Sequence, residues 1–347
     1  MRYSAINLAE YVALRALGCF PAAASVPAGR ALARLVGRLV DASNPRRQKR
    51  MEENISLAFP DWSPDRVKEV RRQSMEHLMQ VVLVDAQIMH RVITEPTWPE
   101  HLFLQSAAPL LDRLMRREPM VVLTAHYGNW EMLGFALSAL EYPIDAVIAR
   151  PVGNKLIYDW ILRIRQAYGT RIISQAGATP ILTSLLEAGG RVGTTADQNA
   201  GDQGIFVPFF GRLASSYKAI ALMAIRHNVP VVIGCARRCE GELCYELHAQ
   251  DIIPPEDWAD QDDPTYYVTA RYTRAIEQMV RIAPEQYLWL HRRWKSRPRF
   301  EREGKPMPQK LINKIKSLPW MTDQELELIM ERSRPTDEAQ SHPPTQN

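Results

Sequence analysis

His126 and Glu131 are the residues whose type and spacing most clearly indicate chemistry. They lie five positions apart in AHYGNWEMLG, directly after the apolar run MVVLTA at 120–125. A neutral imidazole takes a proton from an attacking hydroxyl, and a carboxylate beside it fixes its tautomer and stabilises the imidazolium. The pattern predicts a general base and an acid where a strand ends. The alternatives are a histidine with only structural hydrogen bonds and a glutamate that only complements a helix dipole.

Asn129 lies between these two residues and is a good helix N-cap, which puts Glu131 in the first turn of the next helix. Ligands bind open α/β sheets at the carboxyl ends of the strands, so we expect Asn129 to contact substrate there. Asp197 follows the run VGTTA at 192–196 and should face the same opening. Either Asp197 or Glu131 orients His126, and the sequence does not choose between the two carboxylates.

Arg150 follows the apolar run IDAVIA at 144–149 and is a further catalytic candidate. If strand order follows chain order, its strand lies beside the strand of His126. There Arg150 could donate to an oxyanion formed by attack on a carbonyl, a contribution of roughly 100- to 1,000-fold in rate. It could instead bind an acceptor phosphate through both arms of its guanidinium. The alternative is a surface arginine before Pro151.

An aromatic segment, FVPFFGRL at 206–213, is followed directly by SSYK. We expect it to form a loop that lines an apolar groove and presents cations to a phosphate. The residues concerned are Phe209, Phe210, Gly211, Arg212 and Lys218. The alternative is a buried loop that caps the sheet.

Two patterns along the chain define the elements that must position these residues. Residues 1–105 have mostly helical periodicity, whereas from Pro119 onward short apolar β-branched runs alternate with helical segments. Such alternation predicts an α/β fold with a mostly parallel sheet flanked by helices on both faces. Runs at 229–237 and 243–252 predict an antiparallel edge hairpin, and a helix at about 264–282 should pack back on the sheet.

The N-terminal region indicates contact with a membrane surface. The apolar run at 11–26 is interrupted by Arg15 and Pro21, so a full span is doubtful. ALARLVGRLV at 31–40 has helical apolar spacing with two arginines four apart, as in a helix that lies in a membrane interface. The alternative is an amphipathic helix packed on the protein's own core. We therefore expect a membrane-associating helical segment at 1–45.

The remaining boundaries follow from composition. We expect an α/β domain at 46–318 and a disordered polar, proline-rich tail at 334–347. Apolar residues make up 46% and charged residues 24% of the chain, which excludes a wholly disordered or multi-span protein. The four cysteines are irregularly spaced, so we expect reduced thiols and no metal site. No phosphate-binding loop, dinucleotide fingerprint or H-E-x-x-H is present.

A basic segment at 291–316 contains ten Lys or Arg residues and only two Glu. Such a segment suits anionic lipid headgroups or an acidic carrier protein. Arg292 and Arg293 are candidates for substrate contact at the rim of the site. We do not expect nucleic acid as a partner, because no nucleic-acid-binding motif accompanies the charge. A merely solvated basic helix is the alternative.

Several motifs occur in an order that resembles a known family. They are H-x-x-x-x-E at 126–131, RQKRMEENISLAFPDWS at 47–63, IARP at 148–151, TTADQN at 194–199, FVPFFG at 206–211 and PEQYLWLHRRWKSRP at 284–298. From about residue 5 to 300 the chain resembles the late acyltransferases of bacterial lipid A biosynthesis, the lauroyl and myristoyl transferases. These belong to the lysophospholipid acyltransferase superfamily.

The resemblance implies a fatty acyl thioester as donor, on acyl carrier protein or coenzyme A, and no cofactor. It implies a lipid A precursor hydroxyl as acceptor, with His126 as general base and the acid of the motif as its partner. It also implies a location at the cytoplasmic face of the inner membrane. Two other functions stay open. One is acylation of another lipid, such as a phosphatidylinositol mannoside or a lysophospholipid. The other is a non-catalytic lipid-binding membrane protein, against which the intact His126 and Glu131 weigh.

Overall fold

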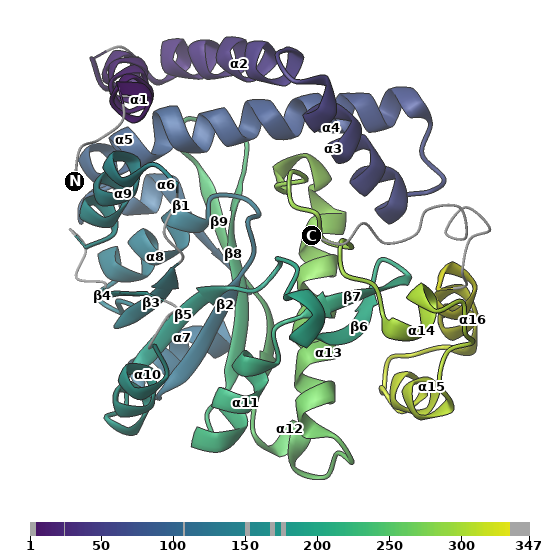
Figure 1. Cartoon of the computed structure of the whole chain (residues 1–347). Helices are drawn as coiled ribbons and strands as arrows, with labels where there is room; N and C mark the ends of the chain where they lie inside the picture. The colour runs from purple at the N-terminus through teal and green to yellow at the C-terminus, as the bar shows by residue number, and fades with distance from the viewer. Residues whose placement is uncertain are drawn as a thin grey trace.

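The fold is described from a computed structural model, which covers residues 5–23, 25–106, 108–149, 153–166, 171–174 and 178–333 (Figure 1). Arg150 and the tail predicted at 334–347 lie outside the described residues. The described residues between Ala5 and His101 are mostly helical, as predicted, and lead into the first strand. The elements are α1 (Ala5–Ala23), α2 (Val26–Ala42), α3 (Pro45–Ala58), α4 (Pro64–Met79), the π-helical turn η1 (Gln80–Asp85), α5 (Ala86–Val92) and α6 (Trp98–His101).

A seven-stranded sheet follows, in the order β1-β9-β8-β2-β5-β3-β4. Five strands, from β8 to β4, are parallel to one another, while β9 runs antiparallel to β8 and carries β1 at the edge. This confirms the mostly parallel α/β class and the antiparallel pairing of the predicted hairpin. The prediction that the hairpin forms the edge of the sheet is wrong, because β1 pairs with β9 and takes the edge position. The strands are β1 (Leu102–Gln105), β2 (Met120–Thr124), β3 (Ala146–Ala149), β4 (Arg171–Ser174), β5 (Arg191–Thr195), β8 (Val231–Arg238) and β9 (Tyr245–Ile253).

Helices cover both faces of this sheet because the central strand is apolar on both sides. All five residues of β2 are buried. Val121 and Leu123 pack in one core, and Met120 and Val122 pack in the other, as the two-residue period of a strand requires. The connecting helices and turns are α7 (Ala108–Met115), α8 (Trp130–Ala139), α9 (Lys155–Gln166), α10 (Ala178–Glu187), η2 (Gly201–Gln203), α11 (Lys218–His227), α12 (Glu256–Ala259), α13 (Pro264–Ile282) and η3 (Pro284–Gln286).

Strand order departs from chain order at the centre of the sheet. The neighbours of β2 are β8 and β5, so β3 does not lie beside the strand that precedes His126. The prediction that these two strands are adjacent is therefore wrong. The register between β2 and β5 pairs Thr124 with Thr195, and the Ala196 amide donates to the Thr124 carbonyl at 3.0 Å. Equivalent positions after these two strands consequently lie side by side.

The aromatic segment forms a β-hairpin, and the predicted loop is wrong in this respect. Strands β6 (Ile205–Phe209) and β7 (Arg212–Ser216) pair antiparallel across a two-residue turn at Phe210 and Gly211, both with positive φ. Such a turn matches the twist of the flanking strands. In Figure 1 the hairpin lies between the main sheet and the last helices. These are α14 (Arg299–Arg302), α15 (Gln309–Lys316) and α16 (Asp323–Arg332).

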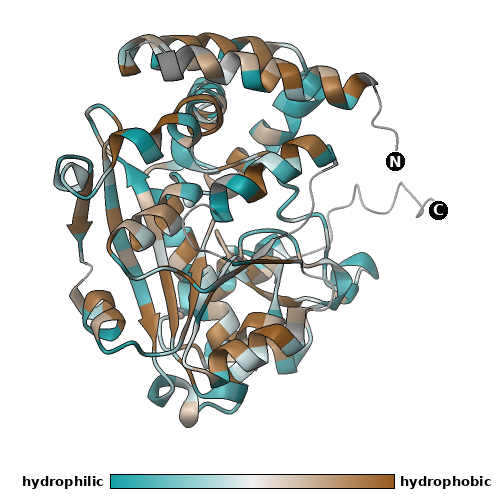
Figure 2. Cartoon of the chain, turned by 90° about the vertical axis from the view of Figure 1, so that its left-hand side faces the viewer, coloured by the Kyte–Doolittle hydropathy of each residue, from teal (hydrophilic) through white to brown (hydrophobic). Residues whose placement is uncertain are grey.

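The helix α2 packs on α4 through its small residues and leaves large apolar ones exposed. A Cβ atom at Gly37 would lie 2.7 Å from the Cα atom of Glu76, so only glycine allows this approach. Leu35 and Leu39 on the same helix are 55% and 61% exposed. Figures 1 and 2 place α1 and α2 along one end of the molecule, with hydrophobic and hydrophilic residues alternating along them. None of the helices in the described ranges is long and apolar enough to cross a membrane.

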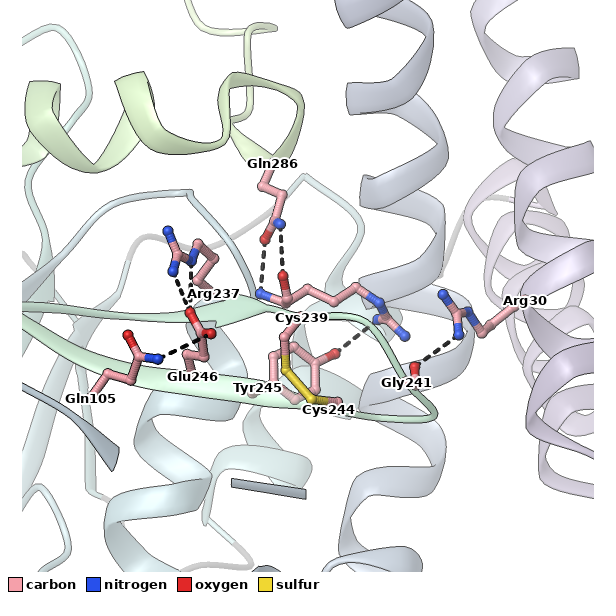
Figure 3. The surroundings of a disulfide bond; sticks show 10 residues. Arg30, Gln105, Arg237, Cys239, Gly241, Cys244, Tyr245, Glu246 and Gln286 are labelled. Carbon is pink, nitrogen blue, oxygen red and sulfur yellow. Dashed lines mark hydrogen bonds and ion pairs between the residues drawn. A yellow bond between two sulfur atoms is a disulfide. The ribbon is translucent and has the colours of Figure 1, made fainter. Parts of the chain in front are cut away.

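Two cysteines form a disulfide where β8 turns into β9, so the expectation of four reduced thiols is wrong for this pair (Figure 3). The antiparallel register sets Arg238 opposite Tyr245, and this brings the next residues, Cys239 and Cys244, to a Cα–Cα distance of 5.4 Å. That separation suits a disulfide. The sequence spacing alone did not reveal the turn that brings them together.

We expect the disulfide to stabilise the folded chain. Closing a loop of about six residues removes unfolded-state entropy worth about 2 kcal/mol. Replacing Cys239 and Cys244 by serine should lower the free energy of unfolding by about this amount, measured by urea denaturation. A reductant should destabilise the unaltered protein similarly and leave the double variant unchanged. Cys19→Ser, at an exposed free cysteine, is the control and should keep the response to reductant.

Candidate active site

His126 and Asp197 occupy equivalent places after the two central parallel strands. Each residue follows its strand by two positions, and the paired ends Thr124 and Thr195 set them at the same level. Nδ1 of His126 lies 2.9 Å from Oδ1 of Asp197, and the His126 amide donates to Oδ2 at 3.1 Å. The Asp197 side chain is fully buried, while that of His126 is 18% exposed. The carboxylate therefore holds both the imidazole and the backbone that carries it.

This contact assigns the tautomer of His126. An ionised carboxylate only accepts hydrogen bonds, so Nδ1 carries the proton and Nε2 has the free lone pair. Burial alone would lower the pKa of His126, but the charge of Asp197 and its hydrogen bond outweigh burial and raise it. Burial raises the pKa of Asp197, yet His126 opposes it and holds that pKa at about 2. A basic Nε2 oriented by a buried anion can act as a general base.

Glu131, the acid of the sequence motif, has a different partner. Its Oε2 accepts from Nε of Arg165 at 2.7 Å, a second contact joins the same two side chains, and Oε1 accepts from Nε1 of Trp130 at 3.0 Å. Burial would raise the pKa of Glu131, but Arg165 lowers it below its usual value. The choice that the sequence left open is thus decided in favour of Asp197 as the partner of His126. Glu131 contributes a negative charge nearby.

Two aromatic rings flank the imidazole of His126. The ring centroid of Trp130 lies 5.2 Å away and that of His291 lies 5.0 Å away, both edge-to-face. His291 is in turn held by Gln198, whose Nε2 lies 3.1 Å from its Nε2. Burial and the nearby His126 lower the pKa of His291, which keeps it neutral. The imidazole of His126 therefore lies between two rings that restrict its rotation.

The short loop after His126 is held from several sides. Gly128 has a φ of +59°, and a Cβ atom there would lie 2.2 Å from the Ala236 carbonyl oxygen. Its amide donates to the Gln286 carbonyl at 3.0 Å, and its own carbonyl lies 2.9 Å from Nε2 of His77 on α4. Burial lowers the pKa of His77 to about 4, so this side chain is neutral and donates from Nε2. Only glycine fits this position.

The helix α3 reaches the same region through Asn54. Its Nδ2 donates to the backbone carbonyls of Trp289 and His291 at 2.8 and 2.7 Å. Asn54 belongs to the basic motif at 47–63, and both acceptors belong to the motif at 284–298. Motifs more than 200 residues apart in the chain therefore meet directly beside the site.

The other predicted site residues are distributed more widely. Asn129 is fully buried and caps α8, its Oδ1 accepting from the Met132 amide at 3.0 Å. Phe209 and Phe210 are each 1% exposed and pack against aromatic side chains, as in the buried alternative. Gly211 forms the hairpin turn. None of the described contacts joins these three hairpin residues to His126.

The predicted cations also differ in their surroundings. Arg212 is partly buried near Arg297 and Arg332, and none of the described contacts joins it to His126, while Lys218 and Arg292 are exposed. The prediction that Arg293 lies at an exposed rim is wrong. It is 3% exposed, and its guanidinium donates to the Ser215 carbonyl and the Ser216 hydroxyl of β7. Arg293 thus binds the hairpin to the segment that carries His291.

Sequence reasoning missed Arg165, His77 and the role of His291. Arg165 follows its partner Glu131 by 34 positions, and nothing in the intervening sequence signals that α9 brings them together. His77 occupies an ordinary helix, and its link to Gly128 exists only in the fold. His291 was part of a recognised motif, so that motif was the available signal. Among the described residues, no cluster of three or more His, Cys, Asp or Glu is arranged to hold a metal ion.

The parallel sheet, the strand-end histidine with its buried carboxylate, and the H-x-x-x-x-E sequence define an α/β acyltransferase of the class that the sequence resembles. A model of the family described as "Bacterial lipid A biosynthesis acyltransferase" matches residues 2–296. The chain therefore belongs to the bacterial lipid A biosynthesis acyltransferases and is an acyltransferase.

Curated relatives agree with this assignment. The lipid A biosynthesis lauroyltransferase of Escherichia coli (strain K12) is 25% identical over 277 residues, covering 78% of this chain and 85% of that protein. The palmitoleoyltransferase of the same organism is 24% identical over 272 residues, covering 76% and 83%. A lipid A biosynthesis acyltransferase of Haemophilus influenzae is 26% identical over 254 residues, covering 71% and 74%.

The two carboxylates should differ in their effect on the pH dependence of acyl transfer. Because Asp197 raises the pKa of His126, Asp197→Asn should move the acidic limb of kcat/KM to lower pH. The same change should lower kcat roughly 100- to 10,000-fold, since the base loses its orienting anion. Glu131→Gln should shift the limb less, because its charge acts on His126 more weakly. A larger loss and a larger shift in Glu131→Gln would reverse the roles assigned here.

Proposed function

We propose that this protein transfers a fatty acyl group from an acyl thioester, carried by acyl carrier protein or coenzyme A, to a hydroxyl of a lipid A precursor. The observation that carries the proposal is the pairing of His126 Nδ1 with the buried Asp197, which leaves Nε2 basic. The names of the curated relatives support a lipid A-type acceptor. Both are consistent with acylation of a hydroxyl by general-base catalysis.

The transfer follows from this geometry in two steps. Nε2 of His126 takes the proton of the acceptor hydroxyl as its oxygen attacks the thioester carbonyl carbon, and the imidazolium is stabilised by Asp197. The tetrahedral intermediate then collapses, the carbon–sulfur bond breaks, and the leaving thiolate takes the proton from the imidazolium. An ester and a free thiol result. Arg165 brings positive charge near the reacting groups, and Arg150 is proposed to donate to the oxyanion or to an acceptor phosphate.

Substrate recognition is proposed to use cations. A phosphorylated disaccharide lipid presents dianionic groups, which arginine binds through two parallel hydrogen bonds. The exposed Arg292 lies next to His291 in the chain and is the candidate closest in sequence to the site. The basic segment at 291–316 is proposed to attract an acidic carrier protein or the anionic membrane surface.

We further propose that the protein works at the cytoplasmic face of the inner membrane. The support is the apolar surface of the N-terminal helices, where Ile6, Leu8 and Val12 on α1 are 70%, 52% and 53% exposed. With Leu35 and Leu39 on α2, they place large apolar side chains on two neighbouring helices. Apolar residues beside arginines suit an interface with anionic lipids.

The acceptor is tested by comparing acyl transfer to a phosphorylated disaccharide lipid with transfer to its dephosphorylated form. We expect a strong preference for the phosphorylated lipid, and His126→Ala should remove transfer to both by roughly 100- to 10,000-fold. Equal use of the two acceptors by the unaltered protein would remove the lipid A assignment. Preferred use of a lysophospholipid or a mannoside lipid would replace it.

The arginines give a sharper test of phosphate binding. If Arg150 binds phosphate through both arms, Arg150→Lys should be nearly as harmful as Arg150→Ala, at a cost of roughly 1.5–3 kcal/mol. At the exposed Arg292 only the charge should count, so lysine should be tolerated and alanine should raise KM for the phosphorylated lipid. Tolerance of lysine at position 150 would exclude the bidentate contact.

Membrane attachment is tested at the exposed apolar residues of α2. Replacing Leu35 and Leu39 by aspartate should move the protein from the membrane to the soluble fraction, because charge opposes burial in the interface. Leu222→Asp on α11 is the control, since Leu222 is 49% exposed and Figure 1 shows α11 at the end of the molecule opposite to α2. High salt alone should release the unaltered protein only in part. Complete release by salt would show purely electrostatic attachment.

A further inference from the structure

A buried polar cluster lies behind the catalytic loop, in residues that the reaction described above does not use. It consists of Asp85 at the end of η1, Arg238 at the end of β8 and Tyr245 at the start of β9. Nη1 of Arg238 lies 2.6 Å from Oδ2 of Asp85, and the Tyr245 hydroxyl bonds to the same oxygen. Asp85 and Tyr245 are both fully buried.

The hydroxyl of Tyr245 has a determined hydrogen-bond direction. It accepts from Nη1 of Arg238 at 3.0 Å and from Nδ2 of Asn129 at 3.2 Å. Both partners are donors only, so the single phenolic proton goes to the Asp85 carboxylate. All three bonding positions of this oxygen are therefore occupied. The hydroxyl cannot turn without losing at least one contact.

The bond from Tyr245 to Asn129 connects the cluster to the catalytic helix. The other polar atom of the Asn129 side chain, Oδ1, caps α8. The backbone amide of Asn129 donates to the Ala236 carbonyl at 2.8 Å. Trp130 and Glu131 begin α8 directly after this cap. The first turn of α8 thus has its position determined on one side by Tyr245 and on the other by the strand β8.

Two features argue against a purely stabilising role for the cluster. A buried ion pair is often no more stabilising than apolar residues of the same volume, because both charges lose their hydration. Asp85 also ends a π-helical turn, a rare interruption that occurs frequently at functional sites. Oδ1 of Asp85 is held by Gln80, the first residue of that same turn, at 2.9 Å. The first residue of the π-helical turn thus binds the carboxylate of the last, and this same carboxylate accepts from Tyr245.

We propose that Asp85, Arg238 and Tyr245 form a positioning cluster that fixes the start of α8 through Asn129, and with it the place of Glu131 beside His126. The proposal deepens the function proposed above and rests on it for the reaction that is measured. The disulfide holds two members of the positioning cluster near each other, because Cys239 follows Arg238 in the chain and Cys244 precedes Tyr245 (Figure 3). Arg30 of α2 donates to the Gly241 carbonyl in the same turn at 2.9 Å.

Tyr245→Phe is the first test, because it removes one hydroxyl and leaves the Asp85–Arg238 ion pair. We expect kcat to fall roughly 10- to 100-fold, as for a small displacement of a catalytic group. KM for donor and acceptor should stay within about twofold, because the lost interaction does not touch substrate.

Tyr267→Phe is the matched control. Tyr267 is 7% exposed, and its hydroxyl accepts from Nη1 of Arg271 at 2.9 Å; Arg271 is in turn paired with Asp257 and Asp251. Tyr267→Phe also removes a buried tyrosine hydroxyl that accepts from an arginine, but on α13. We expect kcat to be unchanged in this variant. If kcat falls equally in Tyr245→Phe and Tyr267→Phe, the loss comes from general destabilisation of the fold, and the proposal is overturned.

A double variant tests whether the effect passes through Asn129. Asn129→Ser keeps an acceptor for the helix cap but has no amide to donate to Tyr245. If the cluster acts through this bond, Tyr245→Phe combined with Asn129→Ser should be no slower than the slower single variant. If the fall of kcat in the double variant equals the product of the falls in the two single variants, Tyr245 acts independently of Asn129. That outcome would overturn the proposal.

Hydrogen exchange of the substrate-free protein provides a readout that does not depend on the acceptor. Amides at 130–135 should exchange faster in Tyr245→Phe than in the unaltered protein, and not in Tyr267→Phe. Unchanged exchange there would overturn the positioning cluster. If the unaltered protein fails to acylate a lipid A-type acceptor, the proposed function fails, while hydrogen exchange still decides whether the cluster holds α8.

Discussion

The hydrogen bond between His126 and Asp197 is the contact on which the rest of the site depends. A fully buried carboxylate is costly unless it is paired, and here both of its oxygens accept from His126, one from the imidazole and the other from the backbone amide. Those contacts exist only while β2 and β5 remain in register, because each residue follows its strand by two positions. The central position of β2 and its two apolar faces therefore determine whether the contact between His126 and Asp197 can form.

The environment gives the two acids near His126 different roles. Asp197 faces the imidazole with no arginine hydrogen-bonded to it among the described contacts, so its charge is directed at His126. Glu131 shares its charge with Arg165, which weakens its pull on the imidazole while leaving a charge pair close to the reacting groups. A motif that names only histidine and glutamate thus leaves out the residue that orients the base.

The N-terminal helices belong to the catalytic framework as well as to the proposed membrane surface. His77 on α4 holds Gly128, and Asn54 on α3 holds the segment of His291 by donating to the carbonyls of Trp289 and His291. Apolar residues of α1 and α2 remain exposed on the outer side of the same helices. One helical layer therefore connects the surface proposed to meet the lipid with the loop that carries the base, which agrees with a family match beginning at residue 2.

The sequence by itself determined the α/β class, the positions of most strands, the antiparallel hairpin and α13, because apolar periodicity and capping residues act locally. It also identified His126, Glu131 and Asp197, since each follows a recognisable strand or begins a helix. It could not decide which acid pairs with His126, because that depends on the strand order that places β5 beside β2. Arg165, His77 and the disulfide were equally hidden, since their partners lie in other elements or across a turn. Tertiary structure decided these points because a side chain's partner and pKa depend on neighbours that only folding brings within a few ångströms.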